Sequence, residues 1–167
     1  DILKREGQLY DNVLLLQGDE PQINPETIDQ LIKEITESNN DVINLIHPIE
    51  NEDLIDTNIV KAIINTDKDI INFSRTAIPA DGKSGFRQLG MIAFKTNGLE
   101  KFSQLKPSKH EIIESIDMMR FLDNDIKIGS FLTHEVITGV DEEHHIGEVE
   151  KKMKNDIFFN KYILSYE

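Results

Sequence analysis

Two aspartates stand where strands of the expected fold end, and both are suited to holding a metal ion. Asp19 follows the apolar run 12–17, and Asp141 follows the strand candidate 136–140. In α/β sheets, ligands bind beyond the carboxyl ends of strands, and carboxylate oxygens are ligands for hard cations such as Mg²⁺. Two such carboxylates would share one ion and leave positions for water and phosphate oxygens. Two simpler interpretations stay open, because Asp19 would also suit a local turn cap and Asp141 the N-cap of a helix.

A second group of charged residues is suited to binding an anion or a sugar. Arg75 follows the apolar run 70–73 near an expected strand end, so it is a better candidate than Arg87. A guanidinium contacts carboxylate or phosphate with two hydrogen bonds, and the alternative is a surface ion pair. Glu114 and Asp117 lie three residues apart on an expected helix. They would share one face, either a solvated face or a rim that accepts sugar hydroxyls.

Other sites are excluded or disfavoured. Adjacent residues on a helix point about 100° apart, so His144 and His145 are expected to be solvated rather than to chelate one ion. The chain has no Ser-His-Asp signature, no Walker loop and no Rossmann glycine motif. The residues by themselves therefore support a two-aspartate metal site without choosing a reaction.

The composition is that of a globular acidic domain. The chain has 167 residues, of which 38% are apolar, and 18 Lys and Arg against 31 Asp and Glu give a net charge of −13. This charge disfavours a nucleic-acid partner, and no apolar run approaches the roughly 20 residues that a membrane span needs. The absence of Cys excludes disulfides, thiolate zinc sites and a cysteine nucleophile. The opening residues suggest a helix rather than a signal peptide, and we expect a cytoplasmic protein.

Strands alternate with helices along the chain, which favours an α/β fold with a mostly parallel sheet flanked by helices. The run 12–17 is typical of a parallel strand buried on both faces. Further strands are expected at 42–46, 59–64, 70–75, 86–94 and 126–131. Helices are expected after the cap pair Asn24-Pro25, after a capping box at Ser108 and Glu111, and over 142–153. The buried stripe of the second helix is expected at Ile112, Ile113, Ile116, Met119 and Leu122.

Six segments, in order, resemble motifs of one family. They are QGDEP at 17–21, NIVK at 58–61, FSRTAIP at 73–79, LGMIAF at 89–94, the helix that follows Pro107 as far as Arg120, and TGVD at 138–141. In these segments the chain is similar to the 3-deoxy-manno-octulosonate cytidylyltransferases, also called CMP-Kdo synthetases. The resemblance runs from residue 12 to about residue 153.

The resemblance implies a nucleotidyltransferase-like, Rossmann-like fold and a reaction that joins CTP to the sugar acid Kdo, releasing pyrophosphate. It also implies Mg²⁺, a homodimer and a role in lipopolysaccharide biosynthesis. Asp19 and Asp141 would be the catalytic and metal-binding aspartates, and Gln17 and Gly18 would contact the nucleotide. The sugar-binding residues would be Ser74, Arg75, Gln88, Glu114 and Asp117.

The chain departs from the family pattern at three points. The family's amino-terminal third, with its phosphate-binding PARxxSxRLPGKPL loop, has no counterpart here. Residues 1–153 are therefore expected to form a cytidylyltransferase domain that lacks its amino-terminal nucleotide-binding loop, and 154–167 a carboxyl-terminal apolar tail. Asp117-Met118 replaces a usual Glu-Gln, and Gln88 replaces a usual His. The alternatives are accordingly a relative of Kdo such as an amino-substituted form, a sialic-acid-like substrate, or a truncated, non-catalytic binding remnant.

Overall fold

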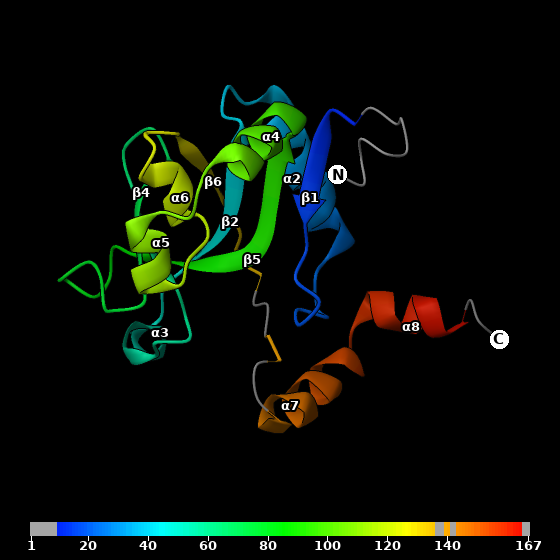
Figure 1. Ribbon diagram of the computed structural model, residues 1–167. Helices are drawn as coiled ribbons and strands as arrows, with labels where there is room; N and C mark the ends of the chain where they lie inside the picture. Colours follow the sequence, from blue (N-terminus) through cyan, green and yellow to red (C-terminus); the bar gives the residue numbers. More distant parts are fainter. Residues whose placement is uncertain (1–9, 136–138, 141–142, 165–167) are drawn as a thin grey trace.

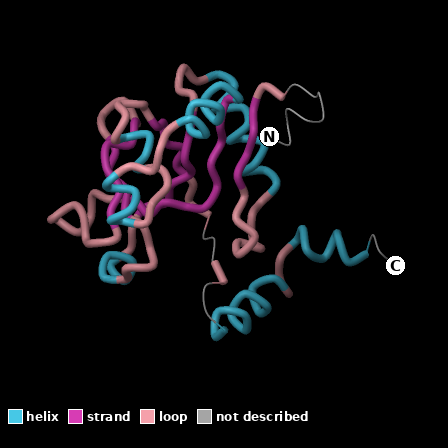
Figure 2. The backbone as a smooth tube through the Cα atoms, in the orientation of Figure 1, coloured by secondary structure: helices cyan, strands magenta, loops and turns pink. Residues whose placement is uncertain are grey.

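In the computed structural model, which describes residues 10–135, 139–140 and 143–164, one β-sheet carries helices on both faces (Figures 1 and 2). The strands are β1 (Asn12–Leu15), β2 (Val42–Pro48), β3 (Lys61–Ile64), β4 (Asp69–Ser74), β5 (Phe86–Lys95) and β6 (Ile128–Leu132). The helices are α2 (Pro25–Glu37), α3 (Asn51–Ile55), α4 (Thr96–Gln104), α5 (Lys109–Glu114), α6 (Met119–Leu122), α7 (Glu143–Met153) and α8 (Ile157–Leu164). Among the described residues, no helix is both long and apolar enough to cross a membrane.

The sheet is mixed, so the expectation of a mostly parallel sheet is wrong. Its strand order is β1-β5-β2-β6-β4-β3, with an additional pairing of β5 and β3. β2 and β6 are parallel, whereas β5 runs antiparallel to β1, β2 and β3, and β4 runs antiparallel to β3 and β6. Because β1 and β2 both oppose β5, they point in the same direction, as their connection through α2 favours. The long strand β5 lies between them and converts a parallel arrangement into a mixed one.

β1 is an edge strand rather than a strand buried on both faces. It pairs with β5 from Asn12 opposite Lys95 to Leu15 opposite Ile92, and it lies at the end of the strand order. Leu15 is 46% exposed and Leu16 43%. The continuous apolar run therefore does not mark a central strand here.

Two hydrophobic clusters lie on opposite faces of the sheet, because successive side chains of a strand point to opposite sides. α2 covers one face, and α4, α5 and α6 cover the other (Figure 1). The cluster under α2 contains Leu31, Ile35, Ile43, Leu45, Leu89, Met91 and Ala93. The larger cluster on the opposite face contains Val42, Ile46, Ala62, Ile70, Phe73, Ile92, Phe94, Ile116, Met118, Met119, Phe121 and Ile128.

The single helix expected after Ser108 is divided into α5 and α6. The capping box is confirmed, since the Ser108 hydroxyl accepts from the Glu111 amide and the Glu111 carboxylate accepts from the Ser108 amide. Ser115 then adopts the left-handed conformation with φ 54°, which ends α5. The predicted buried stripe is therefore only partly right: Ile112 and Ile113 are 68% and 64% exposed, whereas the later positions of the stripe pack into the core.

Candidate active site

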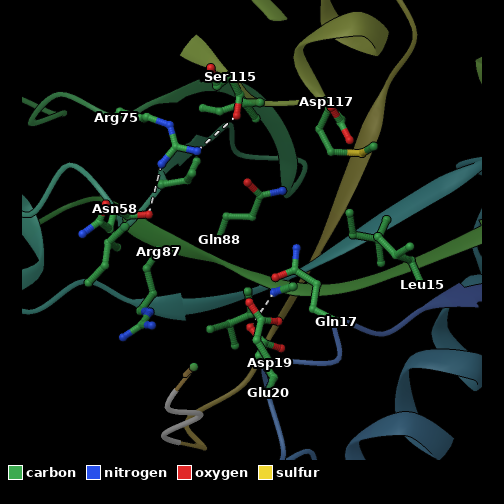
Figure 3. A pocket seen from close by; sticks show the side chains of 18 residues that line it. Leu15, Gln17, Asp19, Glu20, Asn58, Arg75, Arg87, Gln88, Ser115 and Asp117 are labelled. Atoms are coloured by element: carbon green, nitrogen blue, oxygen red, sulfur yellow. Dashed lines mark hydrogen bonds between the residues drawn. The ribbon is translucent and has the colours of Figure 1, made fainter. Parts of the chain in front are cut away.

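A pocket of about 460 Å³ opens beside β5, between the end of β1 and the junction of α5 with α6 (Figure 3). Five of the expected site residues line it: Gln17, Asp19, Arg75, Gln88 and Asp117. Three others, Gly18, Ser74 and Glu114, do not. Asp141 and the strand expected at 136–140 fall at least in part outside the described residues, although Gly139 lines the pocket.

The floor of the pocket is an irregular stretch of β5. As β2 advances from Asn44 to Ile46, the paired position on β5 moves from Ile92 to Gln88, so β5 is bulged. A bulge disrupts the regular ladder and redirects side chains, and bulges are frequent beside active sites. Within this bulge the Leu89 carbonyl accepts a hydrogen bond from the Asn44 side chain at 3.0 Å.

Gly90, in the same bulge, brings the segment after β1 against β5. Its amide donates to the Glu20 carboxylate at 3.0 Å. The Gln17 side chain lies so close that a Cβ on residue 90 would stand 2.5 Å from its Cδ. Side chains at this position of β5 would thus displace Gln17, and Gly90 is what admits the glutamine to the pocket. Gly18, in contrast, has open space around it.

Arg75 is bound mainly to backbone carbonyls. Its Nε donates to the Glu114 carbonyl at 2.8 Å and its Nη2 to the Ser115 carbonyl at 3.1 Å. Its Nη1 donates to the carbonyls of Thr57 at 3.0 Å and Asn58 at 3.2 Å. These bonds use four of the five N–H donors of a guanidinium. Arg75 therefore joins β4, the end of α5 and the 56–59 loop, and among the described residues its fifth N–H has no hydrogen-bond partner (Figure 3).

Lys61 also binds the 56–59 loop, from inside the core. It is fully buried, and its Nζ donates to the carbonyls of Asp56, of Ile59 at 2.9 Å and of Arg75 at 3.0 Å. Burial lowers the pKa of the Lys61 ammonium, and nearby Asp56 opposes that shift. The four consecutive carbonyls 56–59 are thus bound by two cations, Lys61 and Arg75, which fixes the loop wall of the pocket.

Glu114 and Asp117 do not share a helix face as expected, because Ser115 interrupts the helix between them. The Glu114 carboxylate accepts from the Arg75 amide at 2.9 Å and from the Ser74 hydroxyl at 3.4 Å. Glu114 therefore anchors α5 to β4. Asp117 lines the pocket.

Asp19 is placed where a divalent ion could bind. Its side chain lines the pocket, and its carbonyl accepts from the Val140 amide at 2.8 Å. The residue before Asp141 is therefore hydrogen-bonded to Asp19, which is consistent with a pair of carboxylates here. Within the described ranges, no group of three or more acidic or histidine side chains forms a metal cluster. Asp19 carries a hard oxygen donor of the kind that Mg²⁺ takes, whereas Asp141 lies outside the described residues.

Sequence reasoning missed two polar residues that build the pocket. Asn44 stands alone in an otherwise apolar strand, and Lys61 is a charged residue at the start of another. A polar side chain inside an apolar run must find a partner if it is buried, and this is the signal that could have identified both. Neither residue type indicates the partner, because the partners are backbone carbonyls of distant segments.

The fold and the pocket define this chain as an α/β nucleotidyltransferase-like domain. Residues 5–128 match the family model described as Cytidylyltransferase. The chain belongs to the cytidylyltransferase family.

Known relatives agree with the resemblance to CMP-Kdo synthetases, which is confirmed. The chain is 30% identical over 149 residues to the 3-deoxy-manno-octulosonate cytidylyltransferase of Rickettsia rickettsii, with 89% of this chain and 62% of the relative covered. It is 33% identical over 159 residues to that of Chlorobium phaeobacteroides, with 90% and 63% covered. The chain thus spans slightly more than three-fifths of the length of these relatives.

Solved structures show the same fold. A CMP:2-keto-3-deoxy-manno-octonic acid synthetase complexed with CTP superimposes with a TM-score of 0.83 and 28% identity, covering 92% of this chain and 65% of that one. A glucose-1-phosphate thymidylyltransferase of Bacillus anthracis shares the fold alone, with a TM-score of 0.61 and 15% identity over 90% of this chain and 58% of that one.

Proposed function

We propose that this chain forms the part of a cytidylyltransferase site that binds the sugar acid, the acceptor of the cytidylyl group. We propose further that the whole protein joins CTP to Kdo or a close relative. The observation that carries the proposal is the pocket itself. It brings Gln17 and Asp19, from the end of β1, opposite Arg75, Gln88 and Asp117. The similarity to a CMP-Kdo synthetase structure with CTP supports the same assignment.

In the proposed reaction, a hydroxyl oxygen of the sugar acid attacks the α-phosphorus of CTP. The new oxygen–phosphorus bond forms as the bond to pyrophosphate breaks, and the proton of the attacking hydroxyl passes to water. Gln17, held over Gly90, would contact the nucleotide. The loop fixed by Lys61 and Arg75 would shape the sugar end of the pocket, since positioning reactants removes much of the entropic barrier.

Mg²⁺ fits the acidic end of the pocket. Asp19 and Asp141 would hold it, and when bound it would neutralise charge on the phosphates. Asp19 is anchored through its own carbonyl to the Val140 amide, so its position does not depend on the ion. The resemblance further supports a homodimer, a cytoplasmic location and a role in lipopolysaccharide biosynthesis, which we include in the proposal.

The test is magnesium-dependent pyrophosphate release from CTP and Kdo by the product of the whole natural coding sequence. We expect the variant Asp19→Asn to lose activity by about a hundredfold or more, because metal stabilisation of transition-state charge amounts to several kcal/mol. Asp29→Asn, at an exposed position of α2, is the matched control and should leave the rate unchanged.

Pyrophosphate release that requires neither Mg²⁺ nor Asp19 would contradict the assignment of the metal site. The absence of release with Kdo and with related sugar acids would contradict the proposed activity. The 167-residue chain alone should turn over CTP poorly, because its match covers only 62% to 65% of the enzymes it resembles.

A further inference from the structure

The side-chain amide of Asn44 has one possible orientation. Asn44 is fully buried, and its Nδ2 donates to the carbonyls of Leu45 and Leu89, each at 3.0 Å. A backbone carbonyl only accepts hydrogen bonds, so the NH₂ group must face these two oxygens. The carbonyl oxygen Oδ1 of Asn44 must then face the opposite way.

This orientation fixes the neighbouring glutamine in turn. The Nε2 of Gln88 donates to Oδ1 of Asn44 at 2.5 Å. Because Oδ1 cannot donate, the NH₂ group of Gln88 must face it, and Oε1 of Gln88 must point elsewhere. Gln88 lines the pocket and extends into it between Arg75 and Gln17 (Figure 3). In the part of the chain that the structure describes, no hydrogen bond to Oε1 is formed.

We propose that Gln88 selects a hydrogen-bond donor on the bound sugar acid, a hydroxyl or an ammonium group, and that Asn44 is the positioning residue that fixes its amide. The inference rests on the proposed function, which places a sugar acid in this pocket. Oε1 offers lone pairs only, so a carboxylate oxygen at this position would meet another acceptor. The acid group of the sugar is therefore excluded from Gln88.

Reversing the amide to receive an acceptor would be costly. Oε1 of Gln88 would then meet Oδ1 of Asn44, and Asn44 cannot turn without leaving the Leu89 carbonyl in the bulge without its donor. The free-energy cost of leaving a buried polar group without a partner is larger than the net free energy gained from an ordinary hydrogen bond. A site built in this way discriminates against analogues that lack the matching group.

The experiment measures binding by calorimetry to the product of the whole natural coding sequence. The probes are Kdo, its single-deoxy derivatives and an amino-substituted Kdo. We expect the wild type to bind one deoxy derivative about tenfold more weakly than Kdo, the loss expected from one neutral hydrogen bond. Gln88→Met should bind Kdo and this deoxy derivative equally, with about the affinity that the wild type has for the deoxy derivative. Gln104→Met, at the exposed end of α4, is the matched control and should keep the wild-type preference.

Two outcomes of the binding experiment would overturn the inference. One is that Gln88→Met binds Kdo as tightly as the wild type, and the other is that it retains the preference for Kdo over every deoxy derivative. If pyrophosphate release with Kdo persists in either case, the proposed function stands and only this inference fails. If the wild type binds no sugar acid of the panel and releases no pyrophosphate, both fail.

A nuclear magnetic resonance measurement tests the role of Asn44 without relying on activity. The side-chain NH₂ signals of Gln88, identified by their absence in Gln88→Met, should exchange slowly with solvent before and after Kdo binds, because Asn44 retains them. In Asn44→Ala they should exchange faster, and the preference for Kdo should fall. If that variant does not fold, the NH₂ signals of Gln88 in the wild type provide the test. Evidence that the Gln88 NH₂ group leaves Asn44 and donates to the bound sugar instead would overturn the inference.

Discussion

Gly90 matters to the site through the side chain that it lacks. The Gln17 side chain occupies the space where a Cβ on residue 90 would lie, with contacts of 2.5 to 2.8 Å to that position. The Gly90 amide is also bound to Glu20 in the same segment. One residue of β5 therefore sets the position of the chain that carries Gln17 and Asp19 into the pocket.

The substitution Gly90→Ala should push Gln17 out of the pocket. We expect a loss of about 1 to 3 kcal/mol in the free energy of unfolding, the usual cost of overpacking a tightly packed site. CTP should bind at least about tenfold more weakly, since each 1.4 kcal/mol corresponds to a factor of ten. Thermal unfolding and calorimetric titration measure the two effects.

Gly18→Ala is the matched control, because nothing lies within 4 Å of the added Cβ. Its unfolding free energy should change by much less than that of Gly90→Ala. If Gly90→Ala unfolds like Gly18→Ala and binds CTP like the wild type, the close approach of Gln17 to Gly90 does not position the site.

Individual residues of the site were predictable from the sequence only where their type and neighbourhood already carried the information. Gln17 and Asp19 stand beside an apolar run, and the structure places both in the pocket. Arg75 also lines it, but the sequence could not show that four of its donors bind backbone carbonyls of two distant segments. Such bonds involve the main chain, whose chemistry is the same at every residue.

At the scale of elements, the ion pair of Glu111 and Arg120 ties α5 to α6 across the break at Ser115. The Glu111 carboxylate accepts from Nε of Arg120 at 2.8 Å and from its Nη2, and it also accepts from the Ser108 amide at 2.8 Å. The Arg120 guanidinium lies 4.1 Å from the centroid of the Phe102 ring in α4. One carboxylate thus joins the capping box to the packing of three helices.

We expect Glu111→Gln to lower the free energy of unfolding by about 2 to 4 kcal/mol at neutral pH, because it leaves a largely buried arginine without its counter-charge. Hydrogen bonds from Arg120 hold the pKa of Glu111 below its ordinary value of 4.5. A lowered carboxyl pKa contributes stability above the unfolded-state pKa, and that stability is lost as pH falls through the folded-state pKa. The difference between wild type and variant should therefore shrink below about pH 4.5.

Urea unfolding at several pH values measures this difference. Glu34→Gln, at an exposed position of α2, is the control and should have little effect at neutral pH. A difference that stays constant from pH 7 to pH 3 would show that the charge of Glu111 is not what stabilises the junction.

The positions of most elements along the chain could be predicted from local sequence signals. Which elements lie next to each other in space could not. The Asn24 cap and the Ser108 capping box were expected, and both are confirmed. The break at Ser115 was missed, because the hydrophobic pattern continues across it and the bonds that hold the left-handed turn come from Arg75. The insertion of β5 between β1 and β2 was missed for a related reason: alternation along the chain gives strand directions but no strand order.

On the scale of the whole molecule, the strands of the sheet differ in the number of neighbouring strands and in burial. β5 contacts three strands and β2 two, and the residues of β2 from Val42 to Ile46 are all buried. In the described part of the chain β1 pairs with β5 alone, and its last residue, Leu15, is 46% exposed. Local opening requires little free energy where few buried apolar contacts must be broken.

We therefore expect the amides of β1 to exchange with solvent at an opening free energy several kcal/mol below that of β2, because edge strands with few contacts open without global unfolding. Native-state hydrogen exchange of the 167-residue chain measures both strands in one sample.

The pocket segment with Gln17 and Asp19 follows β1 directly, so it should open with this strand. A ligand that binds only the closed form should then raise the opening free energy of β1 by about RT ln(1 + [L]/Kd), which is about 2.7 kcal/mol at a hundredfold excess over Kd, and leave the least protected loops unchanged. Equal opening free energies for β1 and β2 without ligand would show that the edge strand is as firmly held as the centre of the sheet, and that the site is preformed rather than closed by its ligands.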